Sequence, residues 1–241
     1  MRIWILAAAL MLCLTANLAQ AADKTIGVFV ALADNKSQEI VPVPAAIGNG
    51  DDPEQNLYWG NSEGLKGCFD HSAQWKLVEK ADTSQQGNIL RTRTYRHAHG
   101  GAVLYARAYR GSAIRQCIAE YEAAVQHGSY DLVVFIGHNG LMDFNLSPPT
   151  RLPNTKRPDC VVLCCKSEAY FRARLTSAGG HPVLLTTQLM YPGAFILEAA
   201  AETWLAGGKL GGIRESAGAA YARNQKISRK SGVGVFADLK E

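Results

Sequence analysis

The residues best suited to chemistry in this chain are one histidine and one cysteine, each placed just beyond a short apolar run. His138 follows the run Leu132–Ile136 within the glycine-rich segment Gly137–Gly140, and Cys165 follows the run Cys160–Leu163. A cysteine thiol, with a pKa of about 8.5, is mostly protonated at neutral pH, and a neighbouring imidazole can take its proton. The pair therefore predicts either catalysis, with Cys165 as the nucleophile and His138 as the base, or a structural role, with His138 as a capping residue and the cysteine in core packing or a disulfide.

The two apolar runs predict buried strands of one sheet. Both are short and rich in β-branched residues, which is typical of strands covered on both faces. Catalytic groups in open α/β sheets gather at the carboxyl ends of the strands. If these strands are parallel neighbours, the side chains of His138 and Cys165 emerge at the same edge of the sheet.

Strands and helices alternate along the rest of the chain. We expect strands at 25–33, 89–95, 103–109, 182–187 and 233–236, and helices at 68–80, 112–127, 168–177, 193–206 and 213–224. The segment 37–64 is rich in turn-forming residues and predicts a long loop that is functional or mobile. The alternation favours an α/β fold with a mostly parallel sheet flanked by helices on both faces.

The first 21 residues predict a secretory signal peptide. Met1 and Arg2 precede the apolar run Ile3–Leu14, and Ala19–Ala21 supplies the small residues of a cleavage site. No later stretch reaches the roughly 20 apolar residues of a membrane helix. We therefore expect residues 22–241 to form a single domain that is secreted or periplasmic and does not span a membrane.

The charge and the cysteine count limit the possible partners of the protein and the possible states of its thiols. The 25 basic residues, less Arg2, leave 24 against 21 acidic ones, without a basic run, which gives no support for a nucleic-acid partner. Five cysteines follow the signal peptide: Cys68, Cys117, Cys160, Cys164 and Cys165. An odd count in an oxidising compartment leaves at least one thiol unpaired, either as an inert buried side chain or as a nucleophile.

Three groups of residues invite a metal interpretation. Asp51 and Asp52 lie in the long loop, but their spacing is not that of an EF-hand, and solvated turn carboxylates are favoured over a calcium site. The segment His97–His99 separates two expected strands and is typical of a hairpin turn. A zinc site made of Cys160, Cys164, Cys165 and His181 is disfavoured, because Cys160 and Cys164 stand roughly 13 Å apart along a strand, which is too far for one zinc ion. We expect no cofactor.

Three segments together resemble the caspase-like cysteine peptidases, the group that includes caspases, metacaspases, clostripain and gingipains. Val133–His138 resembles the strand that carries the family histidine, and Val161–Cys165 resembles the strand that carries its cysteine. Leu65–Ala73 (LKGCFDHSA) resembles the L-x-G-C-x-N-D-A segment of metacaspases. The resemblance implies a single caspase-like α/β domain, a peptide or protein substrate and a dyad of His138 and Cys165, with Cys164 as the alternative nucleophile.

Further roles follow around this dyad. Gly137 and Gly140 would let a substrate carbonyl approach main-chain N–H groups, and those of Cys165 and of the Asn139–Gly140 turn would hold the oxyanion. Asn139 stands where the family usually has glycine. Asp34, at the end of the first strand, is either an acid that selects arginine or lysine or an ordinary turn residue.

Two functional hypotheses follow. The first is an exported cysteine endopeptidase that hydrolyses peptide bonds through His138 and Cys165. The alternative is a catalytically inactive caspase-like protein with a periplasmic binding or scaffold role, and it is motivated by Asn139 and by Leu163, which stands where caspases place a polar residue. A zinc-dependent hydrolase is a third possibility. The chain carries neither the G-x-S-x-G segment of serine hydrolases nor a P-loop.

Overall fold

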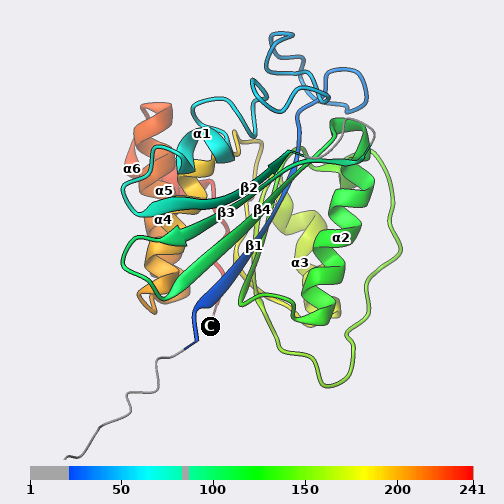
Figure 1. Cartoon of the computed structure of the whole chain (residues 1–241). Coiled ribbons are helices and arrows are strands. Elements are labelled where there is room, and N and C mark those ends of the chain that lie inside the picture. Colours follow the sequence, from blue (N-terminus) through cyan, green and yellow to red (C-terminus); the bar gives the residue numbers. More distant parts are fainter. Residues whose placement is uncertain (1–21, 83–86, 241) are drawn as a thin grey trace, which may run out of the picture.

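A sheet of seven strands organises the chain (Figure 1). The computed structural model describes residues 22–82 and 87–240, so the expected signal peptide lies outside the described residues. The strands are β1 (Lys24–Ala31), β2 (Trp75–Asp82), β3 (Ile89–His97), β4 (Ala102–Tyr109), β5 (Leu132–Ile136), β6 (Asp159–Leu163) and β7 (His181–Leu184). The helices are α1 (Leu65–Phe69), α2 (Ile114–His127), α3 (Ser167–Ala178), α4 (Ala194–Leu205), α5 (Leu210–Gln225) and α6 (Arg229–Gly234).

The sheet is mostly parallel. Its strand order is β2-β3-β4-β1-β5-β6-β7, and within it only β3 runs antiparallel to its neighbours. The prediction of a mostly parallel α/β sheet is confirmed. Strands β2, β3 and β4 lie on one side of β1, and strands β5, β6 and β7 lie on the other side. The strand order therefore reverses its direction between β1 and β5. In open α/β sheets, ligands bind at the carboxyl ends of the strands beside such a point.

Helices cover both faces of the sheet, because the central strands are apolar on both. In β1, Ile26, Val28 and Val30 belong to the buried cluster that includes α4 and α5, whereas Phe29 and Ala31 belong to the cluster that includes α2 and α3. This alternation is the two-residue period of a strand. Figure 1 shows α2 and α3 on one side of the sheet and α1, α4, α5 and α6 on the other.

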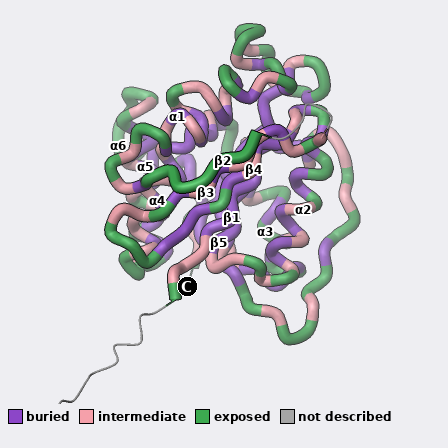
Figure 2. The backbone as a smooth tube through the Cα atoms, viewed as in Figure 1, coloured by how far each residue is buried: buried purple, intermediate pink, exposed green. Residues whose placement is uncertain are grey.

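The prediction of a helix at 68–80 is wrong. Helix α1 ends at Phe69, and the chain then forms the edge strand β2, which pairs with β3. The Ser72 hydroxyl accepts hydrogen bonds from the N–H groups of Gln74 and Trp75, at 3.0 and 3.2 Å, and so stabilises a turn in place of a further helical turn. Strand β2 is largely exposed (Figure 2), so its apolar residues do not form the buried stripe that their helical spacing suggested.

The final strand expected at 233–236 is also wrong. Helix α6 occupies Arg229–Gly234, and Phe236 makes only an isolated antiparallel bridge to Thr186. Ser228 caps this helix by accepting the N–H of Ser231 at 3.0 Å. The helices expected at 112–127, 168–177, 193–206 and 213–224 are confirmed within a few residues. Within the described ranges, no helix combines the length and apolar character needed to cross a membrane.

The long loop between β1 and α1 is held by a buried asparagine and lies over the carboxyl end of β1 (Figure 1). Asn56 is fully buried, and its Oδ1 accepts the N–H groups of Ala33 and Tyr58 at 3.0 and 3.2 Å. Its Nδ2 donates to the carbonyls of Ala33 and Asn49 at 2.8 and 3.0 Å. Because the whole hydrogen-bonding capacity of this amide is used, the loop has a defined shape.

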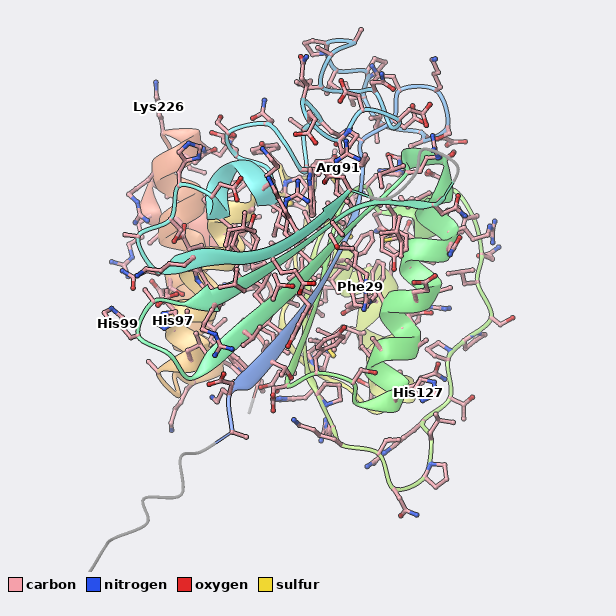
Figure 3. All side chains as sticks on the ribbon, in the orientation of Figure 1. Phe29, Arg91, His97, His99, His127 and Lys226 are labelled. Carbon is pink, nitrogen blue, oxygen red and sulfur yellow. The ribbon has the colours of Figure 1, made fainter. Side chains whose placement is uncertain are left out.

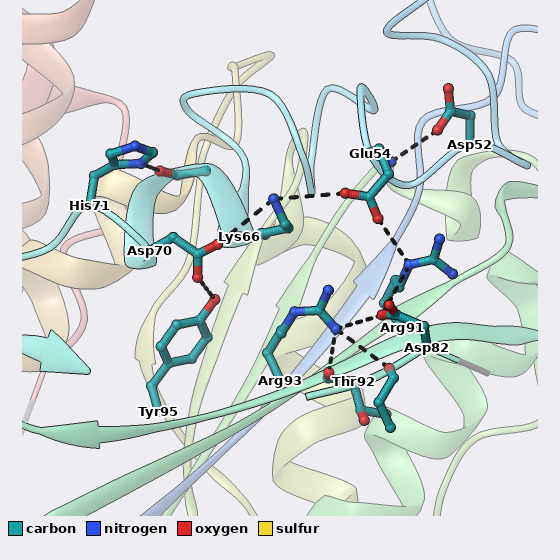
Figure 4. Close-up of polar contacts among 12 residues, drawn as sticks. Asp52, Glu54, Lys66, Asp70, His71, Asp82, Arg91, Thr92, Arg93 and Tyr95 are labelled. Carbon is teal, nitrogen blue, oxygen red and sulfur yellow. Dashed lines mark hydrogen bonds and ion pairs between the residues drawn. The ribbon is translucent and has the colours of Figure 1, made fainter. Parts of the chain in front are cut away.

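Charged residues attach the same loop to the sheet (Figure 4). The carboxylate of Glu54 pairs with Arg91 at 2.9 Å and with Lys66 at 3.7 Å. Arg91 also pairs with Asp82, which receives a hydrogen bond of 3.0 Å from Arg93. The Arg93 hydrogen bond is the main reason that the pKa of Asp82 is lowered. The loop is therefore tied to β3 through the ion pair of Glu54 with Arg91, and through Asn56 to Ala33, just beyond β1.

Candidate active site

His138 and Cys165 line one cavity of about 420 Å³ at the carboxyl edge of the sheet. Strands β5 and β6 are parallel neighbours with Ile136 opposite Leu163, so the residues two positions beyond each strand emerge close together. His138 is 8 % exposed, and Cys165 is half-buried. Within the described residues, no direct hydrogen bond joins the imidazole to the thiol.

The histidine ring is oriented by an aspartate that the sequence analysis did not single out. His138 Nε2 lies 2.8 Å from Oδ2 of Asp143, which follows the short 3-10 turn Gly140–Met142. A carboxylate only accepts hydrogen bonds, so this contact places the ring proton on Nε2 and leaves Nδ1 as the basic nitrogen. The only signal in the sequence was an acidic residue five positions after the histidine. The geometry adds a third member, Asp143, to the expected pair.

The thiol of Cys165 lies against the backbone of Met190, another residue that lines the cavity. The N–H of Met190 lies 3.5 Å from its sulfur, and the carbonyl of the same residue lies 3.6 Å away. The turn after Cys165 is fixed by Ser167, whose hydroxyl donates to the Val162 carbonyl at 2.9 Å. Thr186 completes the support, because its hydroxyl accepts the N–H of Ser167 at 3.0 Å.

The neighbouring thiol of Cys164 is placed quite differently. Cys164 is fully buried in the apolar cluster between the sheet and helices α2 and α3. Burial raises the pKa of its thiol well above the ordinary value, with a further contribution from the nearby Cys165. An apolar, inaccessible thiol of this kind is a poor nucleophile. The structure therefore separates the two candidate nucleophiles and puts only Cys165 beside His138.

Asn139 connects the histidine loop to the cysteine loop. Its side chain is fully buried, and Nδ2 donates a hydrogen bond of 2.7 Å to the carbonyl of Cys165. Its Oδ1 has no hydrogen-bond partner among the described residues. The backbone of Asn139 has φ of −81°, so this position does not require glycine. The asparagine that departs from the family pattern is therefore a direct link between the two halves of the candidate site.

The expected oxyanion donors are only partly available. Gly137 lines the cavity, but the N–H of Gly140 already donates to the His138 carbonyl at 3.1 Å. Within the described residues, the N–H groups of Cys165 and Asn139 have no hydrogen-bond acceptor. Of the main-chain donors named from the sequence, the N–H of Cys165 and that of Asn139 are the ones left unpaired.

Tyr58 is a cavity residue that the sequence analysis missed. The long loop brings it to the cavity that holds His138 and Cys165, where it is 7 % exposed. Burial raises the pKa of its hydroxyl well above the usual range, and the nearby Cys165 and Cys164 raise it further. The hydroxyl has no hydrogen-bond partner among the described residues. Tyr58 therefore adds a protonated hydroxyl group to the cavity that holds the thiol.

Asp34 does not line this cavity. Its carboxylate closes its own turn by accepting the Lys36 N–H at 3.1 Å and the Ser37 hydroxyl at 2.5 Å. The side chain is 8 % exposed and packs against the backbone of Gly50 and Gly111. In this arrangement Asp34 acts as a turn residue, and it does not line the space around His138 and Cys165.

The other residues considered for metal binding have protein partners. Asp51 pairs with Arg110, and Oδ1 of Asp52 accepts the N–H of Glu54 at 3.0 Å. His97 and His99 lie at the end of the β3–β4 hairpin (Figure 3), where His97 Nε2 is 3.2 Å from Glu202. No group of three or more ligating side chains that could hold a metal ion is found in the described parts of the chain.

No protein-family model matches this chain, and no curated protein or solved structure shows significant similarity to it. Its resemblance to the caspase-like peptidases thus rests on its own residues.

Proposed function

We propose that this protein is an exported, caspase-like cysteine endopeptidase. The observation that supports this most is the meeting of His138 and Cys165, from adjacent parallel strands, in one cavity. The contact between Asp143 and Nε2 of the imidazole adds to it, because a base that is itself oriented by a third group is the usual arrangement beside an activated nucleophile.

In the proposed reaction, His138 Nδ1 takes the proton from the Cys165 thiol, and the sulfur attacks the carbonyl carbon of the scissile peptide bond. Asp143 stabilises the imidazolium that results. The imidazolium then gives its proton to the leaving amine, and the carbon–nitrogen bond breaks to leave a thioester on Cys165. A water molecule, deprotonated by His138, hydrolyses the thioester and restores the thiol.

The tetrahedral intermediate carries a negative oxygen, which needs hydrogen-bond donors in the cavity. The N–H of Cys165 is adjacent to the attacking sulfur and has no acceptor among the described residues. Tyr58 is a buried residue that lines the same cavity as Cys165, and burial keeps its hydroxyl protonated. We assign these two groups as the oxyanion donors of the proposed enzyme.

The test uses purified residues 22–241 with a mixture of fluorogenic peptide reporters and with iodoacetamide. We expect reporter cleavage that falls at least a hundredfold in Cys165→Ala and in His138→Ala, since general acid–base catalysis contributes roughly 10²–10⁴-fold. We also expect the alkylated residue of the native protein to be Cys165. Cys164→Ala is the matched control, because it removes the adjacent thiol and should retain cleavage.

The alternative is a binding or scaffold protein without peptidase activity. The absence of a direct hydrogen bond between His138 and Cys165 in the described structure favours it. Under this alternative, iodoacetamide reacts with Cys165 at the same rate in the wild type and in His138→Ala, and no reporter is cleaved. That pair of results would refute the peptidase proposal.

A further inference from the structure

The rim of the candidate cavity carries an unusual concentration of exposed apolar side chains. Eight large hydrophobic residues are exposed in the described parts of the chain, and three of them line this one cavity: Val41, Met142 and Leu189. Val41 and Leu189, at 85 % and 65 % exposure, are the two most exposed of the eight. Exposed apolar side chains gathered at a cavity indicate a surface that binds an apolar group.

These three residues come from separate parts of the chain. Val41 belongs to the loop after β1, Met142 to the turn after β5, and Leu189 to the segment that follows β7. Three loops of unrelated sequence therefore deliver apolar side chains to the carboxyl edge of the sheet. The loop that carries Val41 is itself held in place by Asn56 and Glu54. This convergence makes the apolar rim a built feature of the site.

The interior of the cavity is apolar as well. Ile40, Val43, Met190 and Pro192 complete much of its wall. The backbone of Met190 touches the Cys165 sulfur, so the apolar wall begins at the proposed nucleophile. A substrate side chain beside the attacked carbonyl would meet this wall first.

The acidic groups near the cavity offer little to a basic side chain. Asp143 is engaged by His138, and Asp34 closes its own turn. Glu39 lines the cavity but is exposed, and an ion pair in that setting contributes little. The volume of about 420 Å³ lies near the lower end for ligand sites, which run from about 300 to 1,000 Å³. It suits one large side chain with its adjoining backbone.

We infer that the substrate residue whose carbonyl is attacked is large and apolar, such as leucine, methionine or phenylalanine. This inference rests on the proposed peptidase function and names its substrate class. Met142 and Met190 have flexible, polarizable side chains, which adapt to several apolar shapes. The cavity therefore selects apolar residues as a class and rejects charged ones, which would lose hydration without gaining a buried partner.

The test measures kcat/KM for acetyl-Ala-Ala-Xaa-aminomethylcoumarin reporters, with Xaa as leucine, methionine, phenylalanine, arginine, lysine or aspartate. We expect the apolar reporters to exceed the charged ones by about 10- to 200-fold, the discrimination typical of a hydrophobic pocket. Leu189→Asp should lower kcat/KM for the leucine reporter at least tenfold, mainly through KM. Leu77→Asp, which changes an exposed leucine on β2, is the matched control and should leave it unchanged.

Failure of this inference is distinguishable from failure of the proposed function. If Cys165 is required for cleavage but the arginine, lysine or aspartate reporter is preferred, the peptidase stands and the apolar substrate class is overturned. An arginine preference that disappears in Glu39→Gln would assign the selection to that carboxylate. If no reporter is cleaved, calorimetry on Cys165→Ala compares acetyl-Ala-Ala-Leu-Ala-amide with its arginine counterpart. Equal or tighter binding of the arginine peptide overturns the inference without reference to catalysis.

Discussion

The link made by Asn139 yields the sharpest prediction, because its effects on stability and on activity should differ. We consider Asn139→Ala, which removes the hydrogen bond from Nδ2 to the Cys165 carbonyl, 2.7 Å long and buried. The same substitution removes Oδ1, which is buried without a partner in the described structure. The substitution therefore removes a favourable hydrogen bond together with a buried acceptor that has no partner.

The magnitudes follow from these two atoms. Loss of the hydrogen bond costs about 0.5–1.5 kcal/mol, and a Cys165 carbonyl left dry and unpaired costs about 1–3 kcal/mol. Removal of the unpaired Oδ1 offsets an amount similar to the second cost. The expected net loss is thus about 1 kcal/mol in the free energy of unfolding. For a chain of this size that loss lowers Tm by about 2–4 °C.

Activity should fall much further than stability. Without the link, the histidine loop and the cysteine loop are no longer joined beneath the cavity, and a misplacement of about 1 Å at a reacting group can cost about 10²-fold. We expect kcat/KM for the leucine reporter to fall about a hundredfold, mostly in kcat, since the apolar wall is untouched. Asn139→Gly, which introduces the glycine usual at the matching position of caspase-like peptidases, should show the same loss.

The assay pairs thermal unfolding with steady-state kinetics on the same preparations. A variant that keeps kcat/KM within threefold of the wild type while remaining folded would refute the positioning role. A fall in Tm of more than about 10 °C would refute the energetic reasoning, because it would mean that Oδ1 has a favourable partner in the native protein. Recovery of activity in Asn139→Gly alone would show that backbone freedom matters at this position and that the side-chain link does not.

Three further predictions concern groups around and beneath the site. Tyr58→Phe should lower kcat by about 10²-fold with little change in KM, since loss of one oxyanion donor typically costs about 10²–10³-fold; an unchanged kcat excludes the hydroxyl as a donor. Glu122 is 4 % exposed and pairs with Arg174 at 2.6 Å. Arg174→Met leaves this buried carboxylate without its partner and should lower the free energy of unfolding in urea by about 3–5 kcal/mol. The alkylation of Cys165 in the folded protein should not change. Partial burial alone would raise the pKa of Asp131, but hydrogen bonds from Lys156 and Thr25 outweigh it and lower that pKa. This contribution to stability is fully present above the unfolded pKa of about 3.9 and is lost as the pH falls through the lower folded value. The difference in urea midpoint between the wild type and Asp131→Asn should therefore shrink below about pH 4. A difference that stays constant with pH would contradict this prediction.

The strands around the site could be predicted because a strand that is buried on both faces has a continuous run of apolar residues in its sequence. The runs Leu132–Ile136 and Cys160–Leu163 are apolar and buried at every position, and no tertiary information is needed to recognise them. Strand β2 carries no such mark, since it lies at the edge of the sheet and its residues after Trp75 are exposed. Its strand state is decided by pairing with β3, a contact that helical spacing in the sequence cannot show.

The candidate site was predictable only where it depends on strand ends. His138 and Cys165 follow from the parallel pairing of β5 and β6. Asp143 depends on the short 3-10 turn that brings its carboxylate back to the imidazole, and Tyr58 depends on the path of a long loop. Asn139 was noted as a departure from the family, yet its contact with the Cys165 carbonyl requires both loops to be in place. These three placements depend on the paths of turns and loops, so residue type alone does not reveal them.

The placement of the two adjacent thiols has a consequence for oxidative damage. Cys164 lies on the same face of the sheet as Cys160 and Val162 and is buried in the apolar core there. Cys165 lines the cavity instead. If peroxide converts Cys165 to its sulfenic acid, the neighbouring thiol is on the wrong side of the backbone to capture it as a disulfide. Cys164 therefore gives Cys165 no protection from further, irreversible oxidation, and the working lifetime of the protein would depend on other thiols or reductants that reach the cavity.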